Sequence, residues 1–311
     1  MAPIVTLFPG QGSQKRGMAK DFFTQFESAQ KVFGEASETL NINMEALCFE
    51  EDDKLHQTAF TQPAILTAEI AMFRTLETDF GLQSSHFGGH SLGEYAALVA
   101  AKVIPLNEAL RLVQLRGQLM QEAVPLGEGA MAALIRDELD PVAIGTELEG
   151  LSIDLANLNS PNQVVISGAK KDMEAAIERI QASPSGAGCR AKMLNVSAPF
   201  HSRLMASIEP QFRQALESSL PKWNPTASRT VLSNTTGTFH DGSAPGLVDR
   251  LTRQISGTVC WVQNMRSVVE IEPALILEIG PGRPLRGFFR GINQTVVSVT
   301  NLVSAQRANL T

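Results

Sequence analysis

Residues 88–98 read GGHSLGEYAAL and place a serine between two glycines at the spacing G-x-S-x-G. The segment HFGG precedes this serine, and LGEYAALVAA after it has the apolar composition of a buried helix. Gly-Ser-Gly patterns also occur in ordinary loops, but a serine between a strand and a helix is typical of a nucleophile elbow, whose tight turn favours small flanking residues. We therefore predict an α/β fold in which Ser91 is a nucleophile and the backbone N–H of Leu92 can bind an oxyanion.

The composition excludes several classes of protein. The chain has 311 residues, of which 43% are hydrophobic and 19% charged, as expected of one large globular domain or of a domain with a smaller one inserted. No apolar run is long enough to cross a bilayer, so we expect no membrane partner. The net charge of −6 argues against a nucleic-acid partner. Three cysteines without disulfide or metal spacing fit a reducing compartment, which predicts a cytoplasmic protein.

The pattern of apolar residues changes near residue 128. Residues 129–197 alternate as strand, helix, strand, strand, helix, strand, the split βαβ order of a ferredoxin-like domain. We therefore predict a core formed by residues 1–127 and 198–311 with a ferredoxin-like subdomain inserted at 128–197. In the core we expect helices and strands in this order: a strand at 3–8, helices at 18–33, 63–80 and 105–124, a helix at 201–219, a strand at 230–233, helices at 246–255 and 261–271, and the strands ALILEIG and TVVSV.

A serine hydroxyl needs a base, and five histidines are available. His90 adjoins Ser91, and adjacent side chains on such a turn point apart. His240 lies in the polar turn GTFHDGSAPG, where we expect an exposed side chain. His201 lies in NVSAPFHSRLM, just after a predicted strand, which makes it the best candidate. No aspartate is evident in the chain order Ser…Asp…His, so we predict a dyad whose imidazole is oriented by a carbonyl.

Arg116 lies near the middle of an apolar arc on the predicted helix at 105–124. A guanidinium in that position is costly to bury unless it is paired. Two interpretations are open from the helical wheel alone. Arg116 could pair with an acid elsewhere in the core, or it could bind a ligand carboxylate through two parallel hydrogen bonds. We add Met120, one turn further along, to the predicted substrate pocket.

Nine segments resemble, in order along the whole chain, the malonyl-CoA:acyl carrier protein transacylase family. They are FPGQGSQ (8–14), TQPA (61–64), GHSLGEYAAL (89–98), LRGQLMQEAV (115–124), ANLNSPNQVVISG (156–168), VSAPFHSRLM (196–205), SNTTG (233–237), QI…V.W (254–261) and EIGPG (278–282). The resemblance implies an α/β-hydrolase-like core with a ferredoxin-like insertion, which agrees with the change of pattern near residue 128.

The resemblance also implies a reaction. Malonyl would pass from malonyl-CoA to Ser91 and then to the phosphopantetheine thiol of an acyl carrier protein, for fatty-acid or polyketide synthesis. It implies these roles: His201 as general base and then acid, the N–H groups of Gln11 and Leu92 as oxyanion hole, and Arg116 as the malonyl-carboxylate ligand. His90 and Asn159 would line or support the pocket, and the backbone carbonyl of Gln254 would accept from the His201 ring N–H. Phe200 would disfavour a 2-methyl branch on the acyl group. No bound cofactor or metal is implied.

The carrier proteins of this family's systems are acidic, so a basic surface is expected on this chain. Arg190, Lys192 and Arg203 lie close to His201 in sequence and form our predicted docking set. We expect a monomer. Two alternatives remain: a serine esterase or thioesterase that uses the same Ser91–His201 pair, and a non-catalytic binding module that has kept the fold. The second alternative predicts a missing nucleophile, base or arginine, and all three are present.

Overall fold

Four parallel strands form the central sheet of the larger of two lobes. In the computed structural model, which describes residues 2–50 and 52–308, they are β1 (Ile4–Phe8), β2 (His86–Gly89), β7 (Leu275–Ile279) and β8 (Val297–Val299), in the order β2-β1-β7-β8. The central strands β1 and β7 read IVTLF and LILEI and are almost wholly buried. Near-continuous apolar runs are typical of parallel strands covered on both faces. The strands predicted at 3–8, ALILEIG and TVVSV are confirmed.

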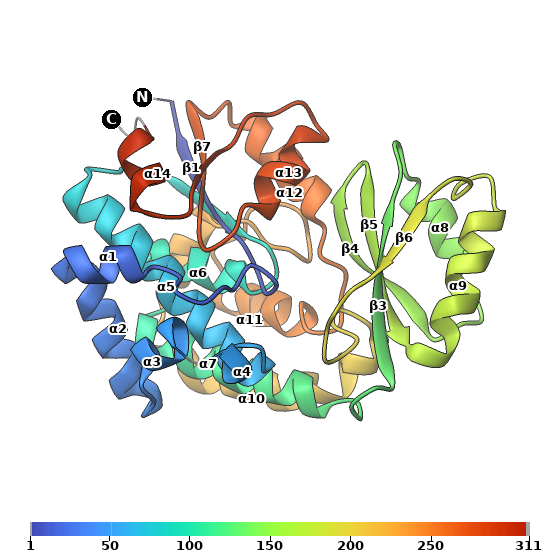
Figure 1. The fold of residues 1–311 in the computed structure, drawn as a ribbon, viewed down its shortest axis with the longest axis horizontal. Coiled ribbons are helices and arrows are strands. Elements are labelled where there is room, and N and C mark those ends of the chain that lie inside the picture. Colours follow the sequence, from blue (N-terminus) through green and yellow to red (C-terminus); the bar gives the residue numbers. More distant parts are fainter. Residues whose placement is uncertain (1, 51, 309–311) are drawn as a thin grey trace.

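Helices enclose this sheet (Figure 1). The long helix α5 (Thr58–Asp79) packs against α2 (Glu27–Leu40), α6 (Gly93–Ala100) and α7 (Leu106–Glu122). The other helices of the larger lobe are α1 (Lys20–Gln25), α3 (Met44–Phe49), α4 (Asp52–Leu55), α10 (Glu209–Ser219), α11 (Ala244–Arg253), α12 (Trp261–Glu270), α13 (Pro284–Arg290) and α14 (Leu302–Arg307), with the 3-10 helices η1 (Arg203–Ile208), η2 (Leu220–Lys222) and η3 (Pro225–Thr230).

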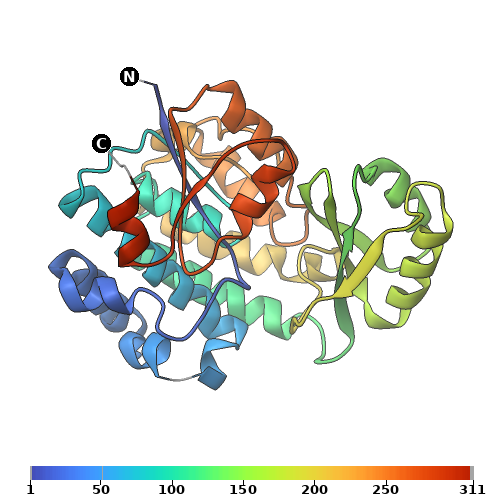
Figure 2. The same ribbon diagram turned by 45° about the horizontal axis from the view of Figure 1, so that its top comes forward.

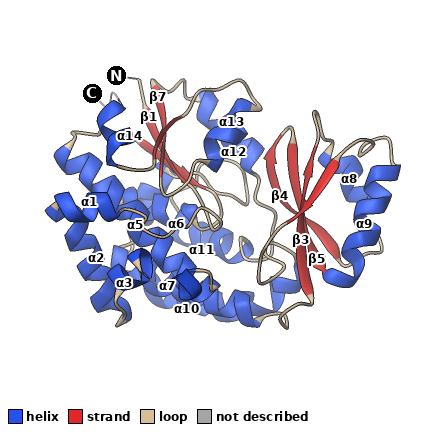
Figure 3. Cartoon of the chain, viewed as in Figure 1, coloured by secondary structure: helices blue, strands red, loops and turns tan. Residues whose placement is uncertain are grey.

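The smaller lobe has the predicted ferredoxin-like order. Its elements are β3 (Gly129–Ile135), α8 (Pro141–Glu147), β4 (Ile153–Ser160), β5 (Gln163–Ala169), α9 (Lys170–Ala182) and β6 (Arg190–Met193). The antiparallel strands lie in the order β4-β5-β3-β6, and both helices cover the outer face of the sheet (Figure 3). Both chain termini lie on the other lobe, so this lobe is an insertion (Figure 2). Its sheet lies within the predicted span 128–197, whose outer limits stay a prediction.

The two faces of the inserted sheet have different partners. Residues such as Ala132, Leu134 and Ile166 form a separate apolar core with α8 and α9. On the opposite face, Met131 and Val165 belong to the core of the larger lobe. The alternation of side chains along each strand thus attaches the smaller lobe to the larger one.

Two predicted helices were wrong in their limits near the N-terminus. The helix predicted at 18–33 is two helices, because Phe26 has an extended backbone (φ −128°, ψ 126°) between α1 and α2. The helix predicted to begin at Pro63 begins at Thr58 and has Pro63 inside it. An internal proline removes a backbone hydrogen bond and costs about 3 kcal/mol. Burial of most of α5 offsets this cost.

Two more predictions fail where tertiary contacts replace regular structure. The helix predicted at 201–219 starts as the 3-10 helix η1 and becomes α-helical only at Glu209. The strand predicted at 230–233 is present only as isolated bridges from Val231 to Phe87 and from Leu232 to Phe239.

Candidate active site

Ser91 lies in a strained turn between β2 and α6. Its φ of +53° is in the left-handed region, which costs a non-glycine residue about 1–2 kcal/mol. A Cβ atom on Gly89 would overlap the backbone of Gly93, and one on Gly93 would overlap the carbonyl of Phe8. Asn234 fixes the turn, because its Oδ1 accepts from the Ser91 N–H at 2.6 Å and its Nδ2 donates to the Gly89 carbonyl at 2.8 Å. The turn therefore has the geometry predicted for a nucleophile elbow.

His201 lies beside the Ser91 hydroxyl. The Oγ of Ser91 is 2.7 Å from Nε2 of His201, and Nδ1 of the same ring is 2.9 Å from the carbonyl oxygen of Gln254. Since a carbonyl can only accept, Nδ1 carries the hydrogen and Nε2 accepts from the serine. Burial, with the positive charge of Arg116 adding to it, lowers the pKa of His201 to about 3. The imidazole is therefore neutral near pH 7, which is the form that a general base needs.

Arg116 on α7 is 1% exposed and points at the same hydroxyl. Its Nη2 donates to Ser91 Oγ and to Gln254 Oε1, each at 3.1 Å, and its Nη1 donates to Gln62 Oε1 at 3.0 Å. Its buried Nε has no hydrogen-bond partner among the residues that the structure describes. Over residues 2–50 and 52–308, no carboxylate forms a direct ion pair with Arg116. Of the two interpretations left open by the sequence, the direct core ion pair is therefore wrong.

A buried carboxylate balances this charge indirectly. Glu94 is 1% exposed and accepts from Gln254 Nε2 at 2.6 Å, from the Asn234 N–H at 3.1 Å and from His240 Nε2 at 2.9 Å. The amide of Gln254 thus bridges Arg116 and Glu94. Burial lowers the pKa of Arg116, whereas the electrostatic interactions with Tyr95 and Glu94 raise it.

The exposed position predicted for His240 is wrong. The residue is 3% exposed. Its partner Glu94 lies 146 residues earlier in the chain, so no local pattern could have indicated the contact. Gln62 is a further site residue that the sequence did not indicate: its Nε2 donates to Gln11 Oε1 at 3.3 Å, and its Oε1 accepts from Arg116.

The hydroxyl of Ser91 opens into a cavity of about 460 Å³ between the two lobes. Most of the predicted pocket residues line it. They are Gln11, His90, Arg116, Met120, Phe200 and His201, joined by residues that the sequence did not single out, among them Gln62, Met131 and the exposed His56. The buried Leu92 directly follows the serine at the start of α6.

His90 bonds to Asn159 and not to the serine. Its Nε2 lies 2.7 Å from Asn159 Oδ1, and Asn159 Nδ2 donates to Gln163 Oε1 at 2.8 Å. Burial lowers the pKa of His90 to about 4, so this ring is also neutral near pH 7. The pair places a residue of β4 against the active-site turn.

The three predicted docking residues fall into two groups. Arg190 and Lys192 are exposed on the edge strand β6, on the face of the sheet that also carries Met131 of the cavity wall. Arg203 differs, because its guanidinium is paired with Asp154. Its charge is already compensated, which makes it a poor member of a docking set.

Neither a metal centre nor a membrane segment emerges from the described part of the chain. No group of three or more His, Cys, Asp or Glu side chains there is arranged to hold a metal ion. The helices described within residues 2–50 and 52–308 include none with both the length and the apolarity that a membrane crossing requires.

Known proteins match the chain over nearly its full length. Residues 5–285 match the family model of the acyl transferase domain. The malonyl CoA-acyl carrier protein transacylase of Bacillus subtilis (strain 168) is 38% identical over 303 residues, which cover 96% of this chain and 93% of the relative. That of Escherichia coli (strain K12) is 37% identical and covers 100% of this chain and 99% of the relative. The chain belongs to the malonyl CoA-acyl carrier protein transacylase family.

Solved structures of this transacylase family share both lobes. The transacylase of Clostridium perfringens superposes with a TM-score of 0.89 at 36% identity, covering 98% of this chain and 96% of that one. A malonyl-transacylase solved in complex with a type II PKS acyl-carrier protein, PlMCAT with AntF, gives 0.89 at 37% identity and 99% coverage of both chains. The protein is thus an acyltransferase with a parallel α/β-hydrolase-like core and a four-stranded antiparallel subdomain.

Proposed function

We propose that this chain transfers malonyl from malonyl-CoA to the phosphopantetheine thiol of an acyl carrier protein through a malonyl ester on Ser91. One observation carries the proposal. The Oγ of Ser91 has the neutral ring of His201 at 2.7 Å on one side and the buried cation of Arg116 at 3.1 Å on the other. The first contact suits a nucleophile, and the second suits an acyl group with a carboxylate of its own.

In the first half-reaction Ser91 Oγ attacks the thioester carbonyl of malonyl-CoA and gives its proton to His201 Nε2. The negative charge on the carbonyl oxygen is stabilised by the backbone N–H groups of Gln11 and Leu92. The carbon–sulfur bond then breaks, and the CoA sulfur takes the proton from His201. The carbonyl of Gln254 stabilises the imidazolium in between, which explains why the site needs no aspartate.

In the second half-reaction the carrier-protein thiol gives its proton to His201 and attacks the ester on Ser91. Loss of the serine oxygen from the tetrahedral intermediate releases the malonyl thioester, and Ser91 regains its proton. Arg116 holds the malonyl carboxylate in both halves. Phe200 in the cavity wall disfavours a 2-methyl branch on the acyl group, at a free-energy cost of about 1–3 kcal/mol. The names of the Bacillus and Escherichia relatives support these substrates.

Intact mass spectrometry tests the proposal. After mixing with malonyl-, methylmalonyl- or acetyl-CoA, we expect one malonyl adduct per chain, less methylmalonyl adduct and least acetyl adduct. Adding a phosphopantetheinylated carrier protein should discharge the adduct. Rapid hydrolysis of neutral acyl esters without an acceptor thiol would instead favour the serine esterase that shares the same Ser91–His201 pair.

For the carrier protein we propose a docking surface around Arg190 and Lys192. The exchange of both for glutamate should raise the KM for carrier protein about tenfold, because acidic partners are attracted by such charges. Malonyl loading of Ser91 from malonyl-CoA should not change. The control is Lys171→Glu, which changes another exposed charge at the start of α9, on the outer side of the same lobe. A KM unchanged in the double variant would contradict this docking surface.

A further inference from the structure

The strand β4 of the smaller lobe contacts the segment that carries Gln254. The carbonyl of Leu155 accepts from Thr258 Oγ1 at 2.7 Å, the carbonyl of Ala156 accepts from the Val259 N–H at 2.9 Å, and the N–H of Leu158 donates back to the Val259 carbonyl at 2.9 Å. Val259 thus forms an isolated parallel bridge with Asn157 at the edge of the smaller lobe's sheet. The carbonyl that orients His201 lies only a few residues earlier in the same segment.

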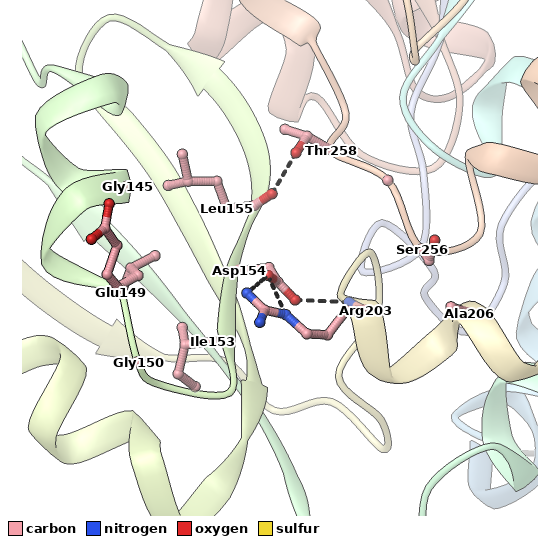
Figure 4. A pocket seen from close by; sticks show the side chains of 12 residues that line it. Gly145, Glu149, Gly150, Ile153, Asp154, Leu155, Arg203, Ala206, Ser256 and Thr258 are labelled. Carbon is pink, nitrogen blue, oxygen red and sulfur yellow. Dashed lines mark hydrogen bonds and ion pairs between the residues drawn. The ribbon is translucent and has the colours of Figure 1, made fainter.

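The same strand also holds the segment that carries His201. Asp154 accepts from Arg203 three times: its Oδ2 from the backbone N–H at 2.7 Å, and its Oδ1 from Nε at 2.8 Å and from Nη2 at 2.5 Å (Figure 4). Arg203 comes two residues after His201, at the start of η1. A single carboxylate therefore binds both the main chain and the side chain next to the general base.

His201 needs such support because of its backbone. Its φ of +58° lies in the left-handed region, and such a residue keeps this conformation only where its surroundings hold it. Inside the loop, Ser202 Oγ donates to the Pro199 carbonyl at 2.7 Å. Asp154 of the smaller lobe binds Arg203, the residue that follows Ser202.

An open cavity makes these bonds more important. A space of about 590 Å³ is lined by β4 and the end of α8 on one side and by Arg203, Ala206 and the segment 256–258 on the other (Figure 4). Side chains do not fill this gap between the lobes. The three hydrogen bonds between Asp154 and Arg203 cross this gap and connect β4 to the His201 loop, in addition to the three between β4 and residues 258–259.

We propose that Asp154 is a positioning residue that holds His201 at hydrogen-bond distance from Ser91 through the backbone of Arg203. The smaller lobe thereby sets the alignment of the reacting pair as well as one wall of the pocket. This inference rests on the proposed function only for the identity of the acyl group. The side chains of Asp154 and Arg203 are 22% and 63% exposed, so their ion pair adds little to overall stability.

The test measures how fast Ser91 reacts, with two reagents. The first is malonyl-CoA in single turnovers. The second is phenylmethylsulfonyl fluoride, with which Ser91 Oγ forms a bond to sulfur, the sulfur–fluorine bond breaks, fluoride leaves, and the serine proton goes to His201 Nε2. For Asp154→Ala we expect the rate constant to fall about tenfold with both reagents, since small displacements of reacting groups are costly. The KM for malonyl-CoA should stay within twofold of the wild-type value.

Conservative variants separate positioning from a loss of folded protein. Asp154→Asn keeps an oxygen for the Arg203 N–H and should recover part of the rate. Arg203→Ala keeps that N–H and should lose about threefold or less. The matched control is Arg213→Ala, which removes a 2.8 Å ion pair to Asp249 between α10 and α11. It should react at the wild-type rate.

Either of two results overturns the inference. One is a rate constant for folded Asp154→Ala, or for Asp154→Asn if the alanine variant does not fold, that equals the wild-type value with both reagents. The other is an equal fall in Arg213→Ala. If the wild-type protein reacts with the sulfonyl fluoride but not with malonyl-CoA, the proposed function fails, and the sulfonylation rates still decide the role of Asp154.

Discussion

Ser91→Ala is expected to abolish the malonyl adduct and to lower malonyl transfer by about 10⁴-fold or more. Removing the nucleophile of such a unit leaves only the contribution of binding and of the oxyanion hole. The substitution deletes one oxygen that accepts from Arg116 and donates to His201, so both partners keep their other hydrogen bonds. Intact mass after incubation with malonyl-CoA and a discontinuous transfer assay measure the two effects.

Ser197→Ala provides the matched control for this experiment. Ser197 lines the same cavity and bonds to Thr58 Oγ1 at 2.9 Å. It should therefore load malonyl at a rate close to that of the wild-type protein. A malonyl adduct that persists in Ser91→Ala and disappears in Ser197→Ala would mean that Ser197, and not Ser91, is the nucleophile.

The parts of the site that the sequence predicted well are those fixed by local backbone geometry. The turn around Ser91 requires glycine at positions 89 and 93, and both positions lie within five consecutive residues. The order of elements in the inserted lobe was readable for the same reason, because each strand and helix carries its own apolar period. Arg116 could be singled out because a charged residue on an apolar arc is anomalous whatever it contacts.

The parts that the sequence did not predict depend on contacts between distant residues. His240 lies in a turn of polar composition, yet it is buried because Glu94 from α6 reaches it. Arg203 was counted as a free positive charge, although its counter-charge Asp154 lies 49 residues earlier in a different lobe. Local composition reports what a residue is, but such partners are set by which distant segments meet in the fold, within the larger lobe for Glu94 and His240 and between the lobes for Asp154 and Arg203.

Arg116→Ala is expected to lower malonyl loading by about 10²–10⁴-fold and to increase acetyl loading. Each charge-assisted hydrogen bond to a carboxylate contributes about 1.5–3 kcal/mol, and the guanidinium can supply two in parallel. Acetyl has no carboxylate, so its loading rate should increase when the buried cation is removed. Arg116→Lys keeps the charge without the planar guanidinium, so its rate of malonyl loading should lie between those of the wild-type protein and Arg116→Ala. Rates of adduct formation with malonyl- and acetyl-CoA check all three proteins.

The ratio of malonyl to acetyl loading, and not either rate alone, decides the role of Arg116. The side chain also donates to Ser91 Oγ, and its charge adds to burial in lowering the pKa of His201. Without it, that pKa rises toward its usual value and the serine loses one donor, which alters loading with any acyl group. Both acyl groups use the same Ser91–His201 pair, so these effects cancel in the ratio. A ratio unchanged in Arg116→Ala would mean that the cation serves the buried Gln254–Glu94 network and not the substrate carboxylate.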